Sequence, residues 1–235
     1  MFTIDKISQE LKKLSQNPKN IKDYSKFHKD GKKHIGIATP LVRKLSAEYF
    51  KEIKNLEKKQ IFLLCEKLLK IGGSSYQDIA FDWAFRIKKQ YTKEDFKIFE
   101  SWLKKYVNTW GSCDDLCSHA FGEFLYQFPE FLPKTKQWTM SPNKWLRRAS
   151  AVVLIYSLRK GKYLQNAFDV AKILLQDGED LVQKGYGWIL KKASGLHQKE
   201  VFDFVIKNKK FMPRTALRYA IEKLPEKMKI KARKK

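Results

Sequence analysis

Apolar residues recur along most of the chain with the period of amphipathic α-helices. Between residues 4 and 14, isoleucine and leucine are spaced so that they share one helical face, with lysine and glutamate between them. Residues 61–69 repeat this pattern, and Gly72-Gly73 follows where a helix is expected to end. The alternation typical of β-strands is nearly absent. The pattern therefore predicts an all-α protein.

The same period predicts helices through the rest of the chain, joined by short loops that contain proline or glycine. Further helices are expected at residues 76–89, 96–106, 116–125, 143–158, 168–175, 181–193, 199–208 and 213–223. No linker is rich in Pro, Gly or Ser, so residues 1–226 are expected to form a single domain. Residues 227–235 carry six basic residues and are expected to be a partly disordered tail.

The spacing of helix pairs indicates a repeat architecture. Arg148 follows Trp110 by 38 residues, and Trp188 follows Arg148 by 40. Repeats of about 40 residues are typical of HEAT-like arrays, in which each unit packs only on its neighbours. The sequence therefore predicts an α-solenoid of HEAT-like helical repeats, a single curved domain with a basic concave face. Trp110, Arg148 and Trp188 would occupy the same phase of successive repeats and line one surface.

Charge narrows the choice of partner. The chain has 49 Lys and Arg against 25 Asp and Glu, a net charge of +24. Such a surplus favours a polyanion, with nucleic acid first and an anionic membrane surface second; a solvated, lysine-rich surface is the alternative without function. No apolar run approaches the roughly 20 residues of a membrane span, and three cysteines favour a reducing compartment. A cytoplasmic protein is expected.

The stretch around Trp110 combines an indole with a carboxylate. In a helix, Trp110 and Asp114 lie four residues apart on one face. Alternatively, Ser112 caps the helix, with Asp115 three residues later completing a capping box, which gives Asp115 a structural role and leaves Asp114 to face outward. The alternative for Trp110 is core packing, the usual role of tryptophan.

Two further stretches offer groups suited to a phosphate backbone. Arg147 and Arg148 lie in the first turns of a helix, where their positive charges oppose the helix dipole. Binding of a phosphate would explain their position, and a solvent-exposed basic pair is the alternative. Around Trp188, two glycines inside a helix predict close approach of another backbone, from a neighbouring helix or a nucleic-acid strand. Trp188 lies among lysines, which suits a sugar or base flanked by phosphates; packing between helices is the alternative.

Other chemistry lacks support in the sequence. Cys113, Cys117 and His119 have no second ligand pair nearby, so no metal site is expected. There is no Walker A sequence and no glycine-rich dinucleotide fingerprint, and no cofactor is expected.

Taken with residues 34–43 and 212–223, these motifs resemble the DNA alkylation repair (AlkD-like) family over about residues 24–223. The resemblance implies a HEAT-like solenoid that cradles duplex DNA. It also implies a DNA glycosylase that removes N3- and N7-alkylated purines, such as 3-methyladenine and 7-methylguanine, in base excision repair without drawing the base into a pocket. The family's functional positions match Trp110, Asp114, Arg148 and Trp188, although the Arg147-Arg148 doublet leaves open which arginine is meant.

The chemistry of these residues agrees with the resemblance. An N3- or N7-alkylated purine is already a cation and leaves without protonation. The reaction therefore needs one carboxylate and no general acid. Asp114 would stabilise the positive charge on the deoxyribose and orient the attacking water. The tryptophans would pack against the sugar, and Arg148 would hold a phosphate. Direct contacts with DNA are expected from Arg147, Lys184, Lys191, Lys192, Arg43, Arg214 and Arg218.

Two rival functions remain from the sequence. One is a non-catalytic HEAT-repeat protein that binds distorted or branched DNA, and the other is a protein-interaction scaffold. The enzyme is preferred because a pure DNA binder gains nothing from a carboxylate facing phosphates. The expected partner is duplex DNA containing alkylated purines, with no membrane and no obligate protein partner, in a cytoplasmic protein that associates with the nucleoid when bound to DNA.

Overall fold

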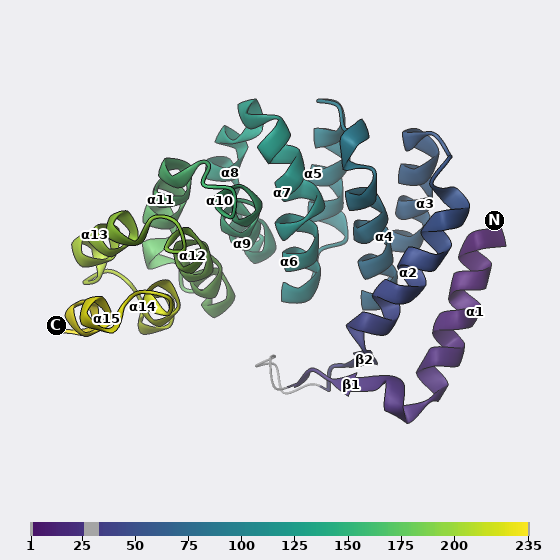
Figure 1. Cartoon of the computed structure of the whole chain (residues 1–235), viewed down its shortest axis with the longest axis horizontal. Coiled ribbons are helices and arrows are strands. Elements are labelled where there is room, and N and C mark those ends of the chain that lie inside the picture. The colour runs from purple at the N-terminus through teal and green to yellow at the C-terminus, as the bar shows by residue number, and fades with distance from the viewer. Residues whose placement is uncertain (1, 26–32, 235) are drawn as a thin grey trace. The chain divides into compact units, whose positions relative to one another are not determined.

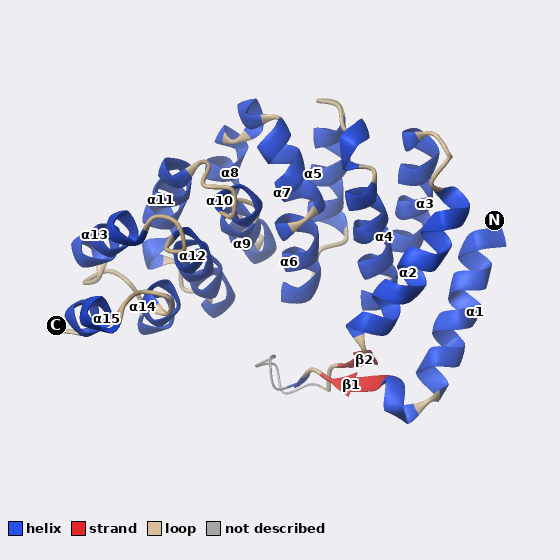
Figure 2. Cartoon of the chain, viewed as in Figure 1, coloured by secondary structure: helices blue, strands red, loops and turns tan. Residues whose placement is uncertain are grey.

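The computed structural model describes residues 2–25 and 33–234, and most of this part is helical (Figure 1, Figure 2). The all-α, helical-repeat prediction is confirmed. The chain divides into two compact units, Met1–Gln90 and Tyr91–Lys235. The single curved domain with a basic concave face stays a prediction. No helix in the described ranges is long and apolar enough to cross a membrane.

The first unit contains four α-helices and a short hairpin within its described residues. These are α1 (Phe2–Gln16), β1 (Ile21–Asp23), β2 (Ile35–Ile37), α2 (Thr39–Ile53), α3 (Lys58–Ile71) and α4 (Ser74–Arg86), with 3₁₀ turns at Pro18–Asn20 and Lys88–Gln90. The strands pair antiparallel, with Ile21 opposite Ile37. The hydrophobic pattern did not predict this hairpin, because three-residue strands are too short to show an alternation.

The α3 helix shows how the sequence specifies these elements. Glu57 and Gln60 form a reciprocal capping box at its start, and Gly72 ends it with a φ of 83°, a backbone conformation that glycine adopts without strain. The predicted stripe is buried, with Ile61, Cys65 and Leu68 all fully inaccessible.

The second unit holds the remaining helices. They are α5 (Asp95–Lys105), α6 (Trp110–Ser118), α7 (Ala120–Gln127), α8 (Pro133–Trp138), α9 (Lys144–Val152), α10 (Ile155–Leu158), α11 (Leu164–Ile173), α12 (Asp180–Ala193), α13 (Gln198–Asn208), α14 (Arg214–Ile221) and α15 (Glu226–Arg233), with 3₁₀ turns at Pro129–Phe131 and Leu174–Gln176. The helix predicted at 143–158 is divided into α9 and α10. The expectation of a disordered tail is wrong for residues 227–233, which lie in α15.

Four helices of the second unit pack side by side in the order α6, α9, α12, α14 (Figure 1). The contact between α12 and α14 depends on Gly187, because a Cβ there would lie 2.7 Å from Tyr219 Cβ and 2.9 Å from the Ala216 carbonyl oxygen. Gly185 faces α9, and a Cβ there would lie 3.4 Å from Arg148 Cγ. The prediction that these glycines admit another backbone is confirmed for Gly187, where the neighbour is a helix.

A cluster of aromatic rings forms much of the core of the second unit. Phe99 and Phe121 stack with centroids 5.4 Å apart, and Phe121 also packs on Phe124 and Trp138. The Trp138 indole N–H donates to Glu100 at 3.1 Å. These rings join α5, α7 and α8 into the support on which α6 and α9 rest.

Candidate functional site

The start of α6 is fixed by Thr109 rather than by Ser112. The Thr109 hydroxyl accepts a hydrogen bond from the Ser112 backbone N–H at 3.1 Å, and the Thr109 N–H donates to Ser112 Oγ at 3.2 Å. The predicted capping box of Ser112 with Asp115 is therefore wrong, because the helix begins three residues earlier. Asp115 is instead buried, with its carboxylate 3.1 Å from His119 Nδ1.

Trp110 and Asp114 lie on one face of α6, as the four-residue spacing predicted. Trp110 is the first helical residue and is half-buried, which differs from the core packing that was the alternative for it. Asp114 follows one turn later. The pair therefore lies on a regular helix, whose N-terminus is capped by reciprocal hydrogen bonds between Thr109 and Ser112.

Asp114 forms a bidentate ion pair with Arg148 of α9. The Arg148 Nε donates to Asp114 Oδ1 and the Nη2 donates to Oδ2, each at 2.9 Å. The remaining nitrogen, Nη1, donates to the carbonyl oxygen of Leu181 in the first turn of α12. The Arg148 side chain is only 6% exposed, whereas that of Asp114 is 19% exposed. Arg148 thus connects three neighbouring helices from within, and the carboxylate is the more accessible partner.

The electrostatics of Asp114 reflect opposing influences. Burial raises the pKa of Asp114 above its usual value, and the neighbouring Asp115 carboxylate adds to the rise. The charge and hydrogen bonds of Arg148 act in the other direction and lower this pKa. The net direction is upward, so Asp114 accepts a proton more readily than an exposed aspartate does.

Arg147 points to a different partner. Its Nε donates to Asp177 Oδ2 at 2.7 Å, and its Nη1 donates to the carbonyl oxygens of Ser141 at 2.9 Å and Pro142 at 3.1 Å. Asp177 is itself buried, with 8% of its side chain exposed. The two arginines therefore have different partners: Arg148 joins Asp114, while Arg147 ties the start of α9 to the segment that precedes α12. In this structure both arginines use their donors inside the protein, whereas a phosphate contact was expected of them.

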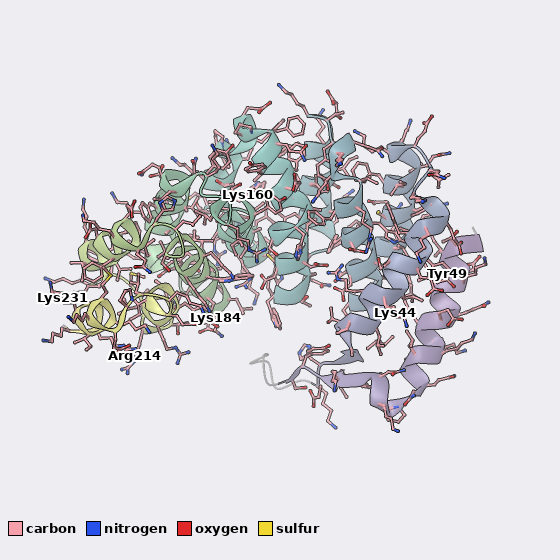
Figure 3. All side chains as sticks on the ribbon, viewed as in Figure 1. Lys44, Tyr49, Lys160, Lys184, Arg214 and Lys231 are labelled. Carbon is pink, nitrogen blue, oxygen red and sulfur yellow. The ribbon has the colours of Figure 1, made fainter. Side chains whose placement is uncertain are left out.

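Trp188 lies on the accessible side of α12. It is half-buried, whereas Val182, Tyr186 and Ile189 are fully buried. Lys184, one turn before it, forms an ion pair with Asp180 at 2.7 Å and is labelled in Figure 3.

The other basic candidates differ in their partners. Lys191 pairs with Glu222 of α14 at 2.6 Å. In the first unit, the Arg43 Nη1 donates to the Asp78 carbonyl oxygen at 2.8 Å. Arg214 and Arg218 of α14 are exposed and, like Lys192, form no ion pair with any residue that the structure describes; Arg214 is labelled in Figure 3.

The helices thus place the four main candidates on three successive elements of one unit. Asp114 and Arg148 are in contact, Trp110 lies one turn before Asp114, and Trp188 lies two turns beyond the Leu181 carbonyl that Arg148 binds. Sequence reasoning missed Asp177 and Leu181. Leu181 takes part through its backbone, which no residue type reveals, and Asp177 lies in a loop whose partner depends on packing.

Comparisons with known proteins identify a family and a fold. A model of the DNA alkylation repair enzyme family matches residues 7–224. No curated protein sequence matches the chain. Among solved structures, one described as a "Predicted DNA alkylation repair enzyme from Enterococcus faecalis" has 20% identity and a TM-score of 0.71, covering 81% of this chain and 88% of its own.

Two structures from Streptococcus mutans are also similar. The one described as AlkD2 has 18% identity and a TM-score of 0.60, and the match covers 93% of this chain and 99% of that chain. The one described as smu.31, from strain UA159, has 19% identity and a TM-score of 0.57, covering 80% and 99%. At these identities the likeness demonstrates a shared fold.

Proposed function

The chain belongs to the DNA alkylation repair enzyme family, and from this premise we propose that it is a DNA glycosylase acting on cationic N3- and N7-alkylated purines in duplex DNA. The observation that carries the proposal is the Asp114 carboxylate, held in a bidentate grip by Arg148 and accompanied on the same helix by a half-buried tryptophan. The reaction is hydrolysis of the N-glycosidic bond in base excision repair.

The substrate explains why one carboxylate is enough. An alkylated purine cation takes the electron pair of the glycosidic bond as it leaves and becomes neutral, so no acid has to protonate it. Positive charge then develops on the deoxyribose, where the Asp114 carboxylate stabilises it. Water adds its oxygen to C1′ and loses a proton, for which Asp114 is a suitable acceptor because burial raises its pKa.

Arg148 acts in this proposal as a positioning residue. Two of its nitrogens fix both carboxylate oxygens of Asp114, and the third is fixed by Leu181. Asp114 therefore needs no rearrangement as charge develops, which is the condition under which an electrostatic group contributes most to a rate. This role replaces the phosphate contact expected from the sequence.

Trp110 and Trp188 supply the apolar contacts. Each is half-buried, so part of each indole is accessible to a nucleotide. Indole faces attract cations within about 6 Å, which favours both the charged base and the developing charge on the sugar. Contact with the backbone and sugar on an open helical surface also suits a lesion that stays outside a protein pocket.

The proposal is tested by incubating the protein with duplex DNA that contains 7-methylguanine. Release of the free base, with abasic sites left in the strand, is the expected result, and a duplex containing the neutral purine hypoxanthine serves as the control. No release from 7-methylguanine or 3-methyladenine duplexes at enzyme excess would overturn the proposal.

One observation favours a second function, a non-catalytic protein that binds distorted DNA. Arg214 and Arg218 are exposed and form no ion pair within the described residues, as a phosphate-binding surface requires. This function predicts salt-dependent binding to DNA without base release. The glycosylase predicts both, so the assay of released base separates the two.

A further inference from the structure

Three basic side chains gather at the C-terminal ends of α10, α12 and α14. Arg159 directly follows α10, Lys192 lies in the last turn of α12, and Lys223 follows α14. None of the three forms an ion pair in the part of the chain that the structure describes. The nearby carboxylate of Glu222 is engaged with Lys191 at 2.6 Å. Within the described residues, the three cations therefore have no ion-paired carboxylate of their own, and the charge of Glu222 acts on Lys192 while Glu222 is paired with Lys191.

Helix packing accounts for their convergence. The ion pair between Lys191 and Glu222 fixes the end of α14 beside the end of α12, and α10 packs on α12 from the other side. Arg159 directly follows α10, and Lys192 lies 11 residues beyond Leu181, near the end of α12. The contact between α10 and α12 therefore brings the segment that carries Arg159 against α12.

The position of Lys192 along α12 gives its distance from the pair formed by Asp114 and Arg148. Eleven residues at about 1.5 Å each place Lys192 roughly 16 Å from Leu181 along the axis of α12. The cluster is therefore separate from the pair of Asp114 and Arg148.

The charges of the cluster oppose one another. Burial lowers the pKa of Lys192, and the charges of Arg159, Lys191 and Lys223 lower it further, while only Glu222 acts in the opposite direction. Cations at helix C-termini interact favourably with the helix dipole. That interaction favours each cation separately, but it gives no reason for three of them to converge from three helices. An anion bound among them would relieve their repulsion.

We propose that Arg159, Lys192 and Lys223 form a phosphate-binding site, which holds one phosphodiester of the DNA backbone away from the damaged nucleotide. The proposal rests on the proposed function for its ligand, duplex DNA. Successive base pairs are about 3.4 Å apart along each strand, so roughly 16 Å corresponds to about five steps. The bound phosphate thus belongs to a distant nucleotide of the same strand or to the opposite strand.

Such a site fixes the register of the duplex and takes no part in bond cleavage. Its loss is therefore expected to weaken binding and raise KM, while the single-turnover excision rate at saturating enzyme stays unchanged. A residue of the catalytic pair would instead change that rate.

The test compares Lys192→Ala with Lys207→Ala. Lys207 is an exposed lysine of α13 that forms no ion pair with the described residues, so its substitution removes the same charge elsewhere in the unit. Binding to an undamaged duplex is measured against salt concentration. Lys192→Ala should weaken binding several-fold and reduce the slope of log K against log salt by about 0.9, the value for one lost phosphate contact. Its melting temperature should stay unchanged or rise.

A neutral methylphosphonate, placed at successive positions of the duplex, identifies the phosphate. At one position, the methylphosphonate should weaken DNA binding by the wild-type protein. At the same position, it should not weaken DNA binding by Lys192→Ala any further. Arg159→Ala, a change at an exposed residue, provides a second variant and should behave in the same way.

The proposal is overturned if both variants match Lys207→Ala in affinity and salt slope, or if no methylphosphonate position distinguishes them from wild type. Both readouts use binding, so they are independent of base release. A reduced slope without any released base would retain this phosphate site and reject the glycosylase.

Discussion

Both units contain a carboxylate bound by arginine between neighbouring helices, and the two arrangements differ in what surrounds the carboxylate. In the first unit, Asp82 accepts hydrogen bonds from Ser46 Oγ at 2.6 Å and Arg86 Nε at 2.7 Å, with Arg43 Nη1 at 3.8 Å. In the second unit, Asp114 has a single arginine, which is almost fully buried. Asp82 is thus shared among several donors, whereas Asp114 is held in one fixed geometry.

The tryptophans of the two units differ in their burial. Trp83 is fully buried, and its indole N–H donates to the Ser46 carbonyl oxygen at 3.0 Å, so it serves the core of the first unit. Trp110 and Trp188 are half-buried. The presence of an aspartate, an arginine and a tryptophan therefore does not define a site. Within the described residues, the second arrangement differs in its accessible tryptophans and in the single arginine that binds Asp114.

The largest expected effect is the difference in stability and activity between removing Arg148 and removing Arg86. Arg148→Ala leaves Asp114 without its counter-charge in a mostly buried position, so we expect a loss of about 3–5 kcal/mol in the free energy of unfolding and of most excision activity. Arg86 is 34% exposed and Asp82 has other donors, so Arg86→Ala should cost about 1 kcal/mol or less and leave activity intact. Urea denaturation measures the free energy of unfolding, and base release measures the excision activity. Equal losses of stability would contradict the distinction.

The tryptophans give the next effect. Trp188→Ala should lower the excision rate about tenfold, as expected for an indole–cation contact of about 1–2 kcal/mol. Trp83→Ala should instead destabilise the protein by about 3–5 kcal/mol, because it creates a cavity in the core. Measured at a temperature where both variants are folded, the activity of Trp83→Ala should stay near that of wild type. A reversed order of activities would show that the half-buried indole is structural.

The pH dependence is the smallest and most specific effect. The reaction uses the ionised form of Asp114, whose pKa is raised from 3.8 by burial. Excision should therefore fall as the pH is lowered through this raised pKa, and the midpoint of the acid limb should lie above 3.8, after spontaneous depurination is subtracted. Asp82→Asn should leave the limb in place. A rate that is constant down to the pKa of an ordinary aspartate would contradict the role of Asp114.

Much of this arrangement could be predicted from periodicity. The apolar stripes located most helices, and the 38- and 40-residue intervals placed Trp110, Arg148 and Trp188 on α6, α9 and α12. Both signals depend on residue type and spacing alone. The strands β1 and β2 were missed because three residues are too few to show an alternation.

Contacts between elements could not be predicted in the same way. Arg147 and Arg148 are neighbours in the sequence, yet one turns to Asp177 and the other to Asp114, because successive side chains project about 100° apart around α9. The capping box was misplaced because Thr109 and Ser112 are both good capping residues, and only the backbone of the preceding loop decides between them.

The central claim is that Asp114 supplies catalytic charge whereas Asp82 supplies structure. The most direct measurement is the single-turnover rate of 7-methylguanine release by Asp114→Asn and by Asp82→Asn, at saturating enzyme and with DNA binding measured in parallel. We predict that Asp114→Asn binds DNA yet loses about 10²–10³ in rate, while Asp82→Asn keeps the rate of wild type. A rate unchanged by Asp114→Asn, or one reduced equally by both substitutions, would contradict this account.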